Sequence, residues 1–253
     1  MLIDTHCHLD FPCFTPLSEK IKVWQAQGVG GFVVPSVGPQ NWQSVLELNR
    51  YPNIAVGLGI HPCFKNGFTA VDNFALQLEK YCDQLAAIGE CGLDGRFKDT
   101  YSQQRVIFIR QLQLAASFNL PVIIHSVRAN DDVYSLLRHY PVPKGGVIHA
   151  FQGSFVQAQR FVDLGFKLGI GGAFVWPRSE KLRKIVTKLP IESIVFETDA
   201  PDMPLPGMSK GENTPLSILQ VVKMAGQVLQ MDEDLLSEFT YKNSVKLFNL
   251  MSV

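Results

Sequence analysis

The stretch Asp4-Thr5-His6-Cys7-His8 follows a short apolar lead-in at the start of the sequence. An extended strand repeats every two residues, so His6 and His8 would point to one face and Cys7 to the other. Two imidazoles about 6–7 Å apart along a strand can both reach one metal ion, at bond lengths of about 2.0–2.1 Å. A His-x-His pair is common by chance, so its meaning depends on what the rest of the chain places opposite it.

Outward from this stretch, short β-rich apolar runs alternate with longer amphipathic segments along the chain. This alternation is typical of a parallel sheet covered by helices. The predicted strands are residues 1–8, 31–37, 54–61, 85–93, 121–126, 146–151, 166–172 and 193–198. The predicted helices are residues 17–27, 41–50, 71–82, 102–118, 129–139, 155–164, 180–189, 215–229 and 233–249.

Eight strand–helix units in succession favour a closed barrel over an open doubly wound sheet. Runs such as Val122-Ile123-Ile124 have the continuous hydrophobicity of strands that are covered on both faces. No glycine-rich dinucleotide loop follows the first strand, which ends in histidines instead. The sequence therefore predicts an α/β fold, a single (β/α)8 TIM barrel with residues 1–253 in one domain. We expect residues 200–214, rich in proline and glycine, to form a loop over one mouth of the barrel.

Composition restricts the partners and the compartment. The chain carries 23 Lys and Arg against 23 Asp and Glu, so no global field gathers polyanions, and a nucleic acid would have to be held by local cations. No leader-like segment and no apolar run of about 20 residues is present, which predicts a cytoplasmic protein without a membrane partner. Five cysteines without a Cys-x-x-Cys pair indicate reduced thiols. Strand alternation turns Cys7 and Cys91 away from the face of their neighbours, so neither is expected to be a ligand.

Imidazoles and carboxylates gather at the predicted strand ends. Five of the six histidines lie there, and the exception, His139, falls at a helix end. A barrel of this type has its active site at the C-terminal ends of the strands, so these side chains should converge. Nitrogen and oxygen ligands suit a pair of divalent ions, and a carboxylate can bridge two metals about 3.5–4 Å apart. The candidate metal ligands are His6, His8, Glu90, His125, His149 and Asp199.

Five motifs resemble those of the TatD-type metal-dependent hydrolases, a family of the amidohydrolase barrel superfamily. They are residues 4–10 (DTHCHLD), 59–62 (GIHP), 88–94 (IGECGLD), 149–153 (HAFQG) and 197–201 (ETDAP). The likeness extends to Asn243 and Leu247-Phe248, so it covers nearly the whole chain. The continuation at residues 202–205 (DMPL) is similar to the YjjV-like branch of the family.

The resemblance implies a metal-dependent hydrolase barrel with a binuclear site. His61 is expected beside the metals, where it contacts a substrate phosphate or orders the water. The identity of the two divalent ions stays open among Zn, Mn and Mg, which all accept mixed histidine and carboxylate ligands. The implied assignment gives one ion to His6, His8 and Asp199, makes Glu90 the bridge, and gives the second ion to His125 and His149.

Two departures from the family pattern affect the substrate-facing loops. The family commonly has Arg two residues after the strand-five histidine, whereas this chain has Val127 there and Arg128 next. Aromatic residues usually follow residue 94, where this chain has Gly95-Arg96. The metal assignment survives both changes, and the substrate assignment is weakened.

The expected reaction is metal-assisted hydrolysis of a phosphodiester by a metal-activated water, with Asp199 as general base. Family resemblance points to a deoxyribonuclease, with 3′ to 5′ trimming of single strands as the finer expectation. Asp10, Glu197 and Asp94 are candidate partners of the metal-bound histidines. The cations to test first are Arg128, Arg96, Lys98 and Arg178, and the aromatic residues that could stack bases or pack helices are Phe64, Phe97, Phe151 and Trp176.

Two other functions stay open. The same ligands can serve a small-molecule phosphoesterase, a lactonase or an amidohydrolase, which the neutral net charge and Val127 favour. A metal-stabilised scaffold without turnover is the third hypothesis. Asp199 argues against it, because a scaffold has little use for a water-activating carboxylate.

Overall fold

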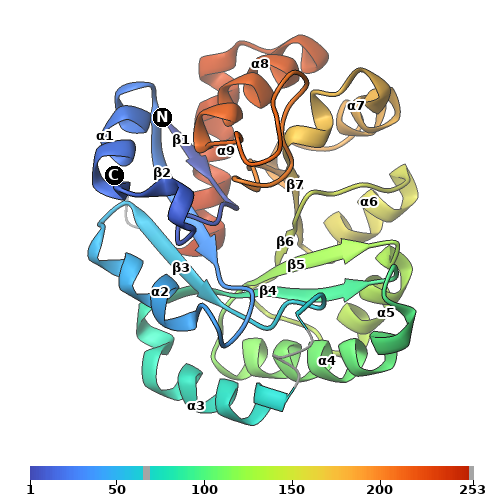
Figure 1. Cartoon of the computed structure of the whole chain (residues 1–253). Helices are drawn as coiled ribbons and strands as arrows, with labels where there is room; N and C mark the ends of the chain where they lie inside the picture. The colour runs from blue at the N-terminus through green and yellow to red at the C-terminus, as the bar shows by residue number, and fades with distance from the viewer. Residues whose placement is uncertain (65–68, 251–253) are drawn as a thin grey trace.

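A computed structural model describes residues 1–64 and 69–250 and shows a barrel of parallel strands surrounded by helices (Figure 1). The strands are β1 (Leu2–Asp4), β2 (Val29–Pro35), β3 (Ile54–Leu58), β4 (Leu85–Asp94), β5 (Val122–Val127), β6 (Gly146–Ile148), β7 (Lys167–Ile170) and β8 (Ile194–Phe196). The helices are α1 (Leu17–Ala26), α2 (Trp42–Leu46), α3 (Val71–Tyr81), α4 (Tyr101–Ser117), α5 (Asn130–His139), α6 (Phe155–Asp163), α7 (Glu180–Val186), α8 (Ile218–Leu229) and α9 (Glu233–Phe248).

The eight strands pair in the order of the sequence, β1 to β8, and every pairing is parallel. The segments that follow β8 and β1 bring the two ends of the sheet together. The Thr5 backbone N–H donates to the Phe196 carbonyl at 3.1 Å, and the Asp199 N–H donates to the His6 carbonyl at 2.8 Å. The predicted (β/α)8 barrel is therefore confirmed.

Apolar side chains fill the lower part of the barrel, the part near the N-terminal ends of the strands. The C-terminal end of α9 inserts Leu247 and Phe248 against them, and both of these side chains are buried. The strands therefore enclose a packed core and leave no pore at this end. The buried strand residues of this inner cluster are Ile3, Val33, Ala87, Ile123, Val147 and Val195.

Several strands end earlier than the sequence predicts. The first was expected over residues 1–8, but β1 ends at Asp4. The predicted strands 146–151 and 193–198 likewise shorten to β6 and β8. The reason is visible just beyond them, where Ala150 (φ 44°) and Asp199 (φ 58°) have left-handed backbones that cannot continue a strand. The histidines and carboxylates thus lie mostly on the loops directly after the strands.

Residues 201–214 contain no α-helix or β-strand and reach the cavity at the C-terminal ends of the strands through Asp202 and Met203. The buried Asn213 amide holds this loop, because it donates to the carbonyls of Thr198 (2.9 Å) and Asp202 (2.5 Å). The expected loop over one mouth of the barrel is present. None of the helices in the described part of the chain has the length and hydropathy needed to cross a bilayer.

Candidate metal centre

Four side chains converge at the C-terminal end of the barrel beside β1. The Nε2 atom of His6 lies 3.3 Å from Glu90 Oε2 and 3.5 Å from Asp199 Oδ1. The Nε2 atom of His8 lies 3.5 Å from Asp199 Oδ1 and 4.0 Å from Glu90 Oε2. Two ligands that bind one ion at 2.0–2.1 Å in a tetrahedral or octahedral arrangement are about 3.0–3.4 Å apart. The four atoms, with contacts of 3.3–4.0 Å, are at or slightly beyond this spacing, so a small inward movement of the side chains would suit a single ion between them.

Glu90 reaches a second group of imidazoles with its other oxygen. Glu90 Oε1 lies 2.9 Å from His125 Nδ1 and 3.3 Å from His61 Nε2. The two rings touch, with His61 Nε2 at 3.1 Å from His125 Nδ1. Because one carboxylate contacts both groups, Glu90 occupies the position that a bridging ligand requires.

His149 joins the first group from the opposite side. Its ring stacks on His6 with the centroids 3.6 Å apart, and its Nε2 atom lies 3.7 Å from Asp199 Oδ2. Its Nδ1 atom lies 2.8 Å from Glu197 Oε1, which fixes the direction in which the ring points. Gly169 makes room for that carboxylate, because a Cβ atom there would approach Glu197 Oε2 to 2.2 Å.

The histidines are thus divided differently from the implied assignment. The described residues form three groups close enough to hold an ion: His6 with His8 and Glu90, His6 with His149 and Asp199, and His61 with Cys63 and His125. His125 and His149 fall in different groups, so their sharing of one ion stays a prediction. His61 was expected beside the metals, and it lies within contact distance of Glu90.

Asp94 holds His125 from behind. Its Oδ2 atom lies 3.1 Å from His125 Nε2, and the carboxylate also accepts from Arg96 Nε at 2.9 Å. The Cys63 thiol donates to the same Oδ2 over 3.3 Å. Burial and this carboxylate raise the pKa of Cys63 to about 12, so the sulfur stays a thiol at neutral pH. Cys63 thus contacts Asp94, and it also lies close enough to His61 and His125 to complete a group that could hold an ion.

Neighbouring imidazoles hold the pKa values of the carboxylates of the cluster below their ordinary values. Burial raises the pKa of Asp199, but His149 and the neighbouring imidazoles outweigh it and hold that pKa well below the ordinary value. Glu90 has a lowered pKa for the same reason, with His61 and His6 opposing burial. Conversely, burial lowers the pKa of His149, whereas its carboxylate neighbours raise it well above the ordinary value. The pKa values of His6 and His61 are instead lowered, mainly by burial, so these two rings are neutral and have nitrogen lone pairs to offer a metal ion.

The environment of His6 Nε2 shows whether these residues suit a metal ion. His6 Nε2 is completely buried and accepts or donates no hydrogen bond with any described residue, although it faces Glu90 and Asp199. An unsatisfied buried imidazole nitrogen costs free energy unless another partner is present. Three nitrogens and two carboxylates around that position form the ligand set of a divalent ion. The residues therefore fit the group that the sequence predicts.

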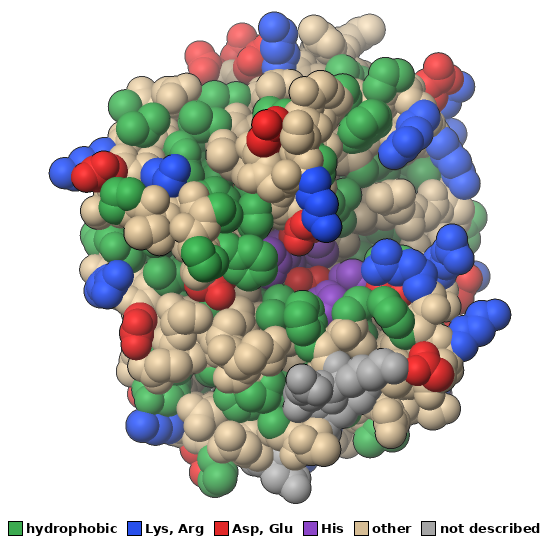
Figure 2. Space-filling model, in the orientation of Figure 1, with side chains coloured by type: hydrophobic (Ala, Val, Ile, Leu, Met, Phe, Trp, Pro, Cys, Tyr) green, Lys and Arg blue, Asp and Glu red, His purple; other side chains and the backbone are tan. Residues whose placement is uncertain are grey.

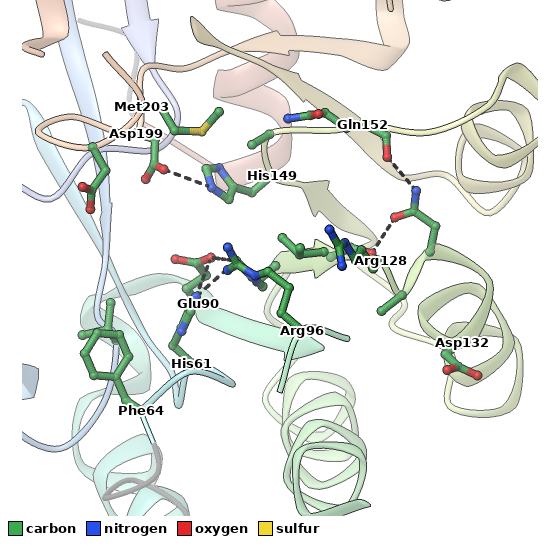
Figure 3. Close-up of a pocket in the computed structure, with 18 of the residues that line it drawn as sticks. His61, Phe64, Glu90, Arg96, Arg128, Asp132, His149, Gln152, Asp199 and Met203 are labelled. Carbon is green, nitrogen blue, oxygen red and sulfur yellow. Dashed lines mark hydrogen bonds and ion pairs between the residues drawn. The ribbon is translucent and has the colours of Figure 1, made fainter. Parts of the chain in front are cut away.

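The cluster forms the floor of a cavity of about 1140 Å³. Figure 2 shows the histidines at the bottom of a hollow, with apolar and basic side chains around its mouth. In the close-up, Asp199 and His149 face each other on one side, and Arg96 and Arg128 lie across the cavity (Figure 3). The hollow is large enough for a substrate of several rings.

The other candidates from the sequence divide into those that reach the cavity and those that do not. Arg96, Arg128 and Phe64 line it. Lys98 and Arg178 are exposed and are absent from its described lining. The remaining aromatic candidates lie elsewhere: Phe97 is exposed beside Arg96, Phe151 is in the core, and Trp176 is stacked under Arg178.

Gly95 packs closely against the backbone of Arg128. Arg128 has a left-handed backbone (φ 52°), and a Cβ atom at Gly95 would lie 2.8 Å from the Arg128 carbonyl oxygen. A larger residue at position 95 would therefore push away the loop that carries the arginine. The two departures from the family pattern are coupled through this contact.

Of the proposed partners of the histidines, Glu197 and Asp94 contact His149 and His125, whereas Asp10 accepts a hydrogen bond from Asn41 at 3.0 Å. Sequence reasoning missed the Cys63 thiol and the Asn213 amide. Their signal is weak, because a lone cysteine or asparagine in a loop has no periodicity.

Comparison with known proteins finds metal-dependent hydrolases that match this chain over nearly its whole length. Residues 3–249 match the family model described as TatD related DNase. The uncharacterised metal-dependent hydrolase YjjV of Escherichia coli K12 is 38% identical over 253 residues, which is 98% of each chain. The human deoxyribonuclease TATDN3 is 33% identical over 266 residues, covering 98% of this chain and 94% of its own.

A solved structure agrees with the sequence comparison. The crystal structure of YjjV, a TatD homologue from Escherichia coli K12, superposes with a TM-score of 0.93 at 37% identity and covers 99% of this chain and 98% of its own. The motifs, the barrel and the cluster at its rim are consistent with one origin. The chain belongs to the TatD family of metal-dependent hydrolases.

Proposed function

We propose that this protein is a divalent-metal-dependent deoxyribonuclease that cleaves phosphodiester bonds of DNA. The observation that carries the proposal is the cluster of imidazoles and carboxylates on the floor of a cavity whose mouth presents Arg96 and Arg128. A hydrolytic ligand set beside guanidinium groups suits an anionic ester. The name of the human relative, a deoxyribonuclease, supports DNA as the substrate class.

Two divalent ions complete the site in this proposal. His6, His8, Glu90 and Asp199 would hold one of them, and His125 and His149 the other, with Glu90 between the two. Bound there, the ions lower the pKa of a water and neutralise charge on the phosphoryl oxygens. The spacing around His6 Nε2 supports the first position.

The protein's own groups perform the remaining tasks. Asp199 is the general base, because it lines the cavity with its Oδ2 atom 3.7 Å from His149 Nε2 and its lowered pKa keeps the carboxylate ionised. Arg128 and His61 bind the substrate phosphate. Glu197 and Asp94 keep the rings of His149 and His125 in place.

A second candidate is a hydrolase of small phosphoesters, lactones or cyclic amides. It is favoured by Asp202 in the same lining, which offsets part of the positive charge of the two arginines, whereas Asp131 and Asp132 are paired with Arg160 and Arg105. Arg96 is also already paired with Asp94. A weak local field limits the attraction of a long polyanion at this mouth.

We place the enzyme in the cytoplasm, with DNA as its partner and no obligatory protein partner. All five cysteines are free thiols, which suits a reducing compartment.

The test is a substrate panel on protein loaded with Zn, Mn or Mg. Single-stranded and duplex DNA, labelled at either end, are compared with an aryl phosphodiester, a lactone and a cyclic amide. We expect metal-dependent cleavage of single-stranded DNA, with stepwise shortening from the 3′ end. Turnover of the lactone or amide alone would overturn the proposal in favour of the second candidate. The Asp199→Asn variant, purified identically, controls for contaminating nucleases.

A further inference from the structure

A second hollow lies outside the catalytic cavity, between the first turn of α6 and the helix α7. It is a groove of about 550 Å³. Both helices flank the right side of the barrel in Figure 1, and basic side chains gather on that side of the mouth in Figure 2. The residues that line the groove are Phe155, Glu180, Lys181, Lys184, Ile185 and Lys188.

The charge of this region departs from that of the chain as a whole. Residues 178–188 (RSEKLRKIVTK) contain five Lys or Arg and one acidic residue, whereas the whole chain has a net charge of zero. No ion pair within 4 Å joins Lys181, Lys184 or Lys188 to an acidic group of the described residues. Elsewhere on the surface, pairing is found, as between Arg160 and Asp131 at 3.3 Å. The groove therefore presents unneutralised positive charge.

Aromatic surface lies among these cations. Phe155 is 36% exposed, although it is a large apolar side chain, and the Lys188 ammonium lies 5.5 Å from the centre of its ring. Lys181 and Lys184, three residues apart on one helix face, repel each other, which lowers the stability of α7 slightly and indicates that they serve another purpose than folding. Cations interleaved with an exposed ring are the arrangement that binds a single-stranded nucleic acid, by phosphate contacts and base stacking.

The groove adjoins the catalytic cavity. Phe155 lines the groove and Gln157 lines the cavity, and both belong to the first turn of α6. Residues two apart project from opposite sides of a helix, so the two hollows lie on either side of the first turn of α6, which is about 10 Å across with its side chains. Ser154 fixes this turn with a capping box, because its side chain accepts from the Gln157 backbone N–H and the Gln157 side chain accepts from the Ser154 N–H.

We propose that the groove between α6 and α7 is an exosite for single-stranded DNA whose end occupies the catalytic cavity. Lys181, Lys184 and Lys188 contact phosphates, and Phe155 stacks on a base. The inference rests on the proposed function and extends it: the few cations at the mouth of the cavity are supplemented by a basic track on the other side of α6. Long single strands are then bound more tightly than dinucleotides.

The test compares K181Q/K184Q/K188Q with a control that removes the same charge elsewhere, K22Q/K144Q/K246Q, whose lysines are exposed and line neither hollow. Binding of a labelled 20-nucleotide single strand is followed by fluorescence anisotropy at several salt concentrations, with chelator present so that no turnover occurs. The groove variant should bind about tenfold more weakly, and its salt slope should fall by about 2, since each lysine contributes about 0.7 on a single strand. F155A should weaken binding about fivefold without changing the slope.

The outcomes separate the groove from the proposed activity. If the wild-type protein binds the strand and the groove variant does not, the exosite stands even when no DNA is cleaved, and only the nuclease assignment fails. If the groove variant binds like the wild type, or the control variant loses as much, the exosite is wrong. The exosite is also wrong if the groove variant weakens binding of a dinucleotide as much as binding of the 20-nucleotide strand. The same holds if the variant weakens binding of duplex DNA only. In an active enzyme, the groove variant should raise KM for the long strand and leave kcat on an aryl phosphodiester unchanged.

Discussion

The inside of the barrel changes its chemistry within two residues along the same strands. Near the N-terminal ends of the strands, the inward side chains are aliphatic and pack on α9. Two residues further along, the inward side chains are imidazoles and carboxylates. The lower and upper members are Ile123 and His125 on β5, Val147 on β6 with His149 directly after it, and Val195 on β8 with Glu197 directly after it.

The two layers differ in how they are held. The lower layer needs only apolar contact, and it is closed by Leu247 and Phe248. The upper layer has left-handed backbones at Ala150 and Asp199, each of which costs about 1–2 kcal/mol for a residue with a Cβ atom. It also buries His6 Nε2 without a hydrogen-bond partner among the described residues. Stability therefore resides in the lower layer, and it allows the upper layer to be arranged for binding cations.

The largest expected effects come from one substitution in each layer. Asp199 represents the upper layer in the loop after β8, and Val195 represents the lower layer on β8 itself. Asp199→Asn removes both a ligand atom and the proposed base, so we expect kcat to fall about 10⁴-fold, equal to about 5 kcal/mol, while the fold persists. Val195→Ala, four residues earlier, should lower the melting temperature and leave kcat of the folded enzyme within about twofold. Both are measured by metal-dependent cleavage and by thermal unfolding. If Asp199→Asn retains full activity, the upper layer has been assigned the wrong base.

The second prediction concerns the closure of the lower layer. Phe248→Ala removes a buried ring that fills the base of the barrel, and it should cost about 3–5 kcal/mol of unfolding free energy. Activity per folded molecule should not change. Leu235→Ala on the same helix is the control, since Leu235 is 45% exposed and its loss should matter by no more than about 0.5 kcal/mol. Urea unfolding measures both. Equal losses for the two variants would show that α9 does not seal the barrel.

The third prediction sharpens the comparison inside the upper layer. Glu197→Gln weakens the partner of His149, and a change of this kind costs about 10–100-fold in metal affinity or rate. Gly169→Ala should have the same effect by a different route, because its new Cβ atom would displace the Glu197 carboxylate. Kinetics and metal titration of the two single variants and the double variant test this. The double variant should be no worse than the worse single variant, and simple additivity would contradict a shared mechanism.

The element order is the part that the sequence predicted best. Alternating apolar runs set the strands within a few residues, and the helix predicted over residues 155–164 begins at the same residue as α6. The six candidate ligands also gather at one rim, because parallel strands in a barrel all end on the same side. The placing of residues 1–253 in a single domain stays a prediction.

The finer geometry of the upper layer could not be predicted in the same way. Which imidazole faces which carboxylate depends on side-chain rotamers and on left-handed turns such as those at Ala150 and Asp199, for which the sequence carries no period. The contact between Gly95 and the Arg128 carbonyl joins two loops that are distant in sequence. The thiol of Cys63 beside Asp94 is similar, since tertiary packing alone brings them together.

The smallest effect that we predict is a dependence of stability on pH that arises from the imidazoles of the upper layer. In the metal-free protein, burial lowers the pKa values of His8, His125 and His149, but neighbouring carboxylates outweigh it and raise all three. A group with a raised pKa in the folded state contributes stability that is complete below its unfolded pKa, near 6.5, and that is lost as pH rises through the folded pKa. The melting temperature should therefore fall between pH 6.5 and 9, by roughly 3 °C if about 1 kcal/mol is lost.

Divalent ions should reverse this slope, because imidazoles must lose their protons before they bind a metal. The stabilisation that an added ion confers should then grow with pH over the same range. His149→Gln should flatten both trends, whereas His139→Gln should change neither, since His139 lies at the end of α5 and bonds only to the Ser135 carbonyl among the described residues. Thermal unfolding with chelator or metal at several pH values measures both slopes. If the melting temperature of the metal-free protein does not change across this range, the carboxylates do not keep these rings protonated. The upper layer would then not differ from the lower layer in carrying charged groups that titrate.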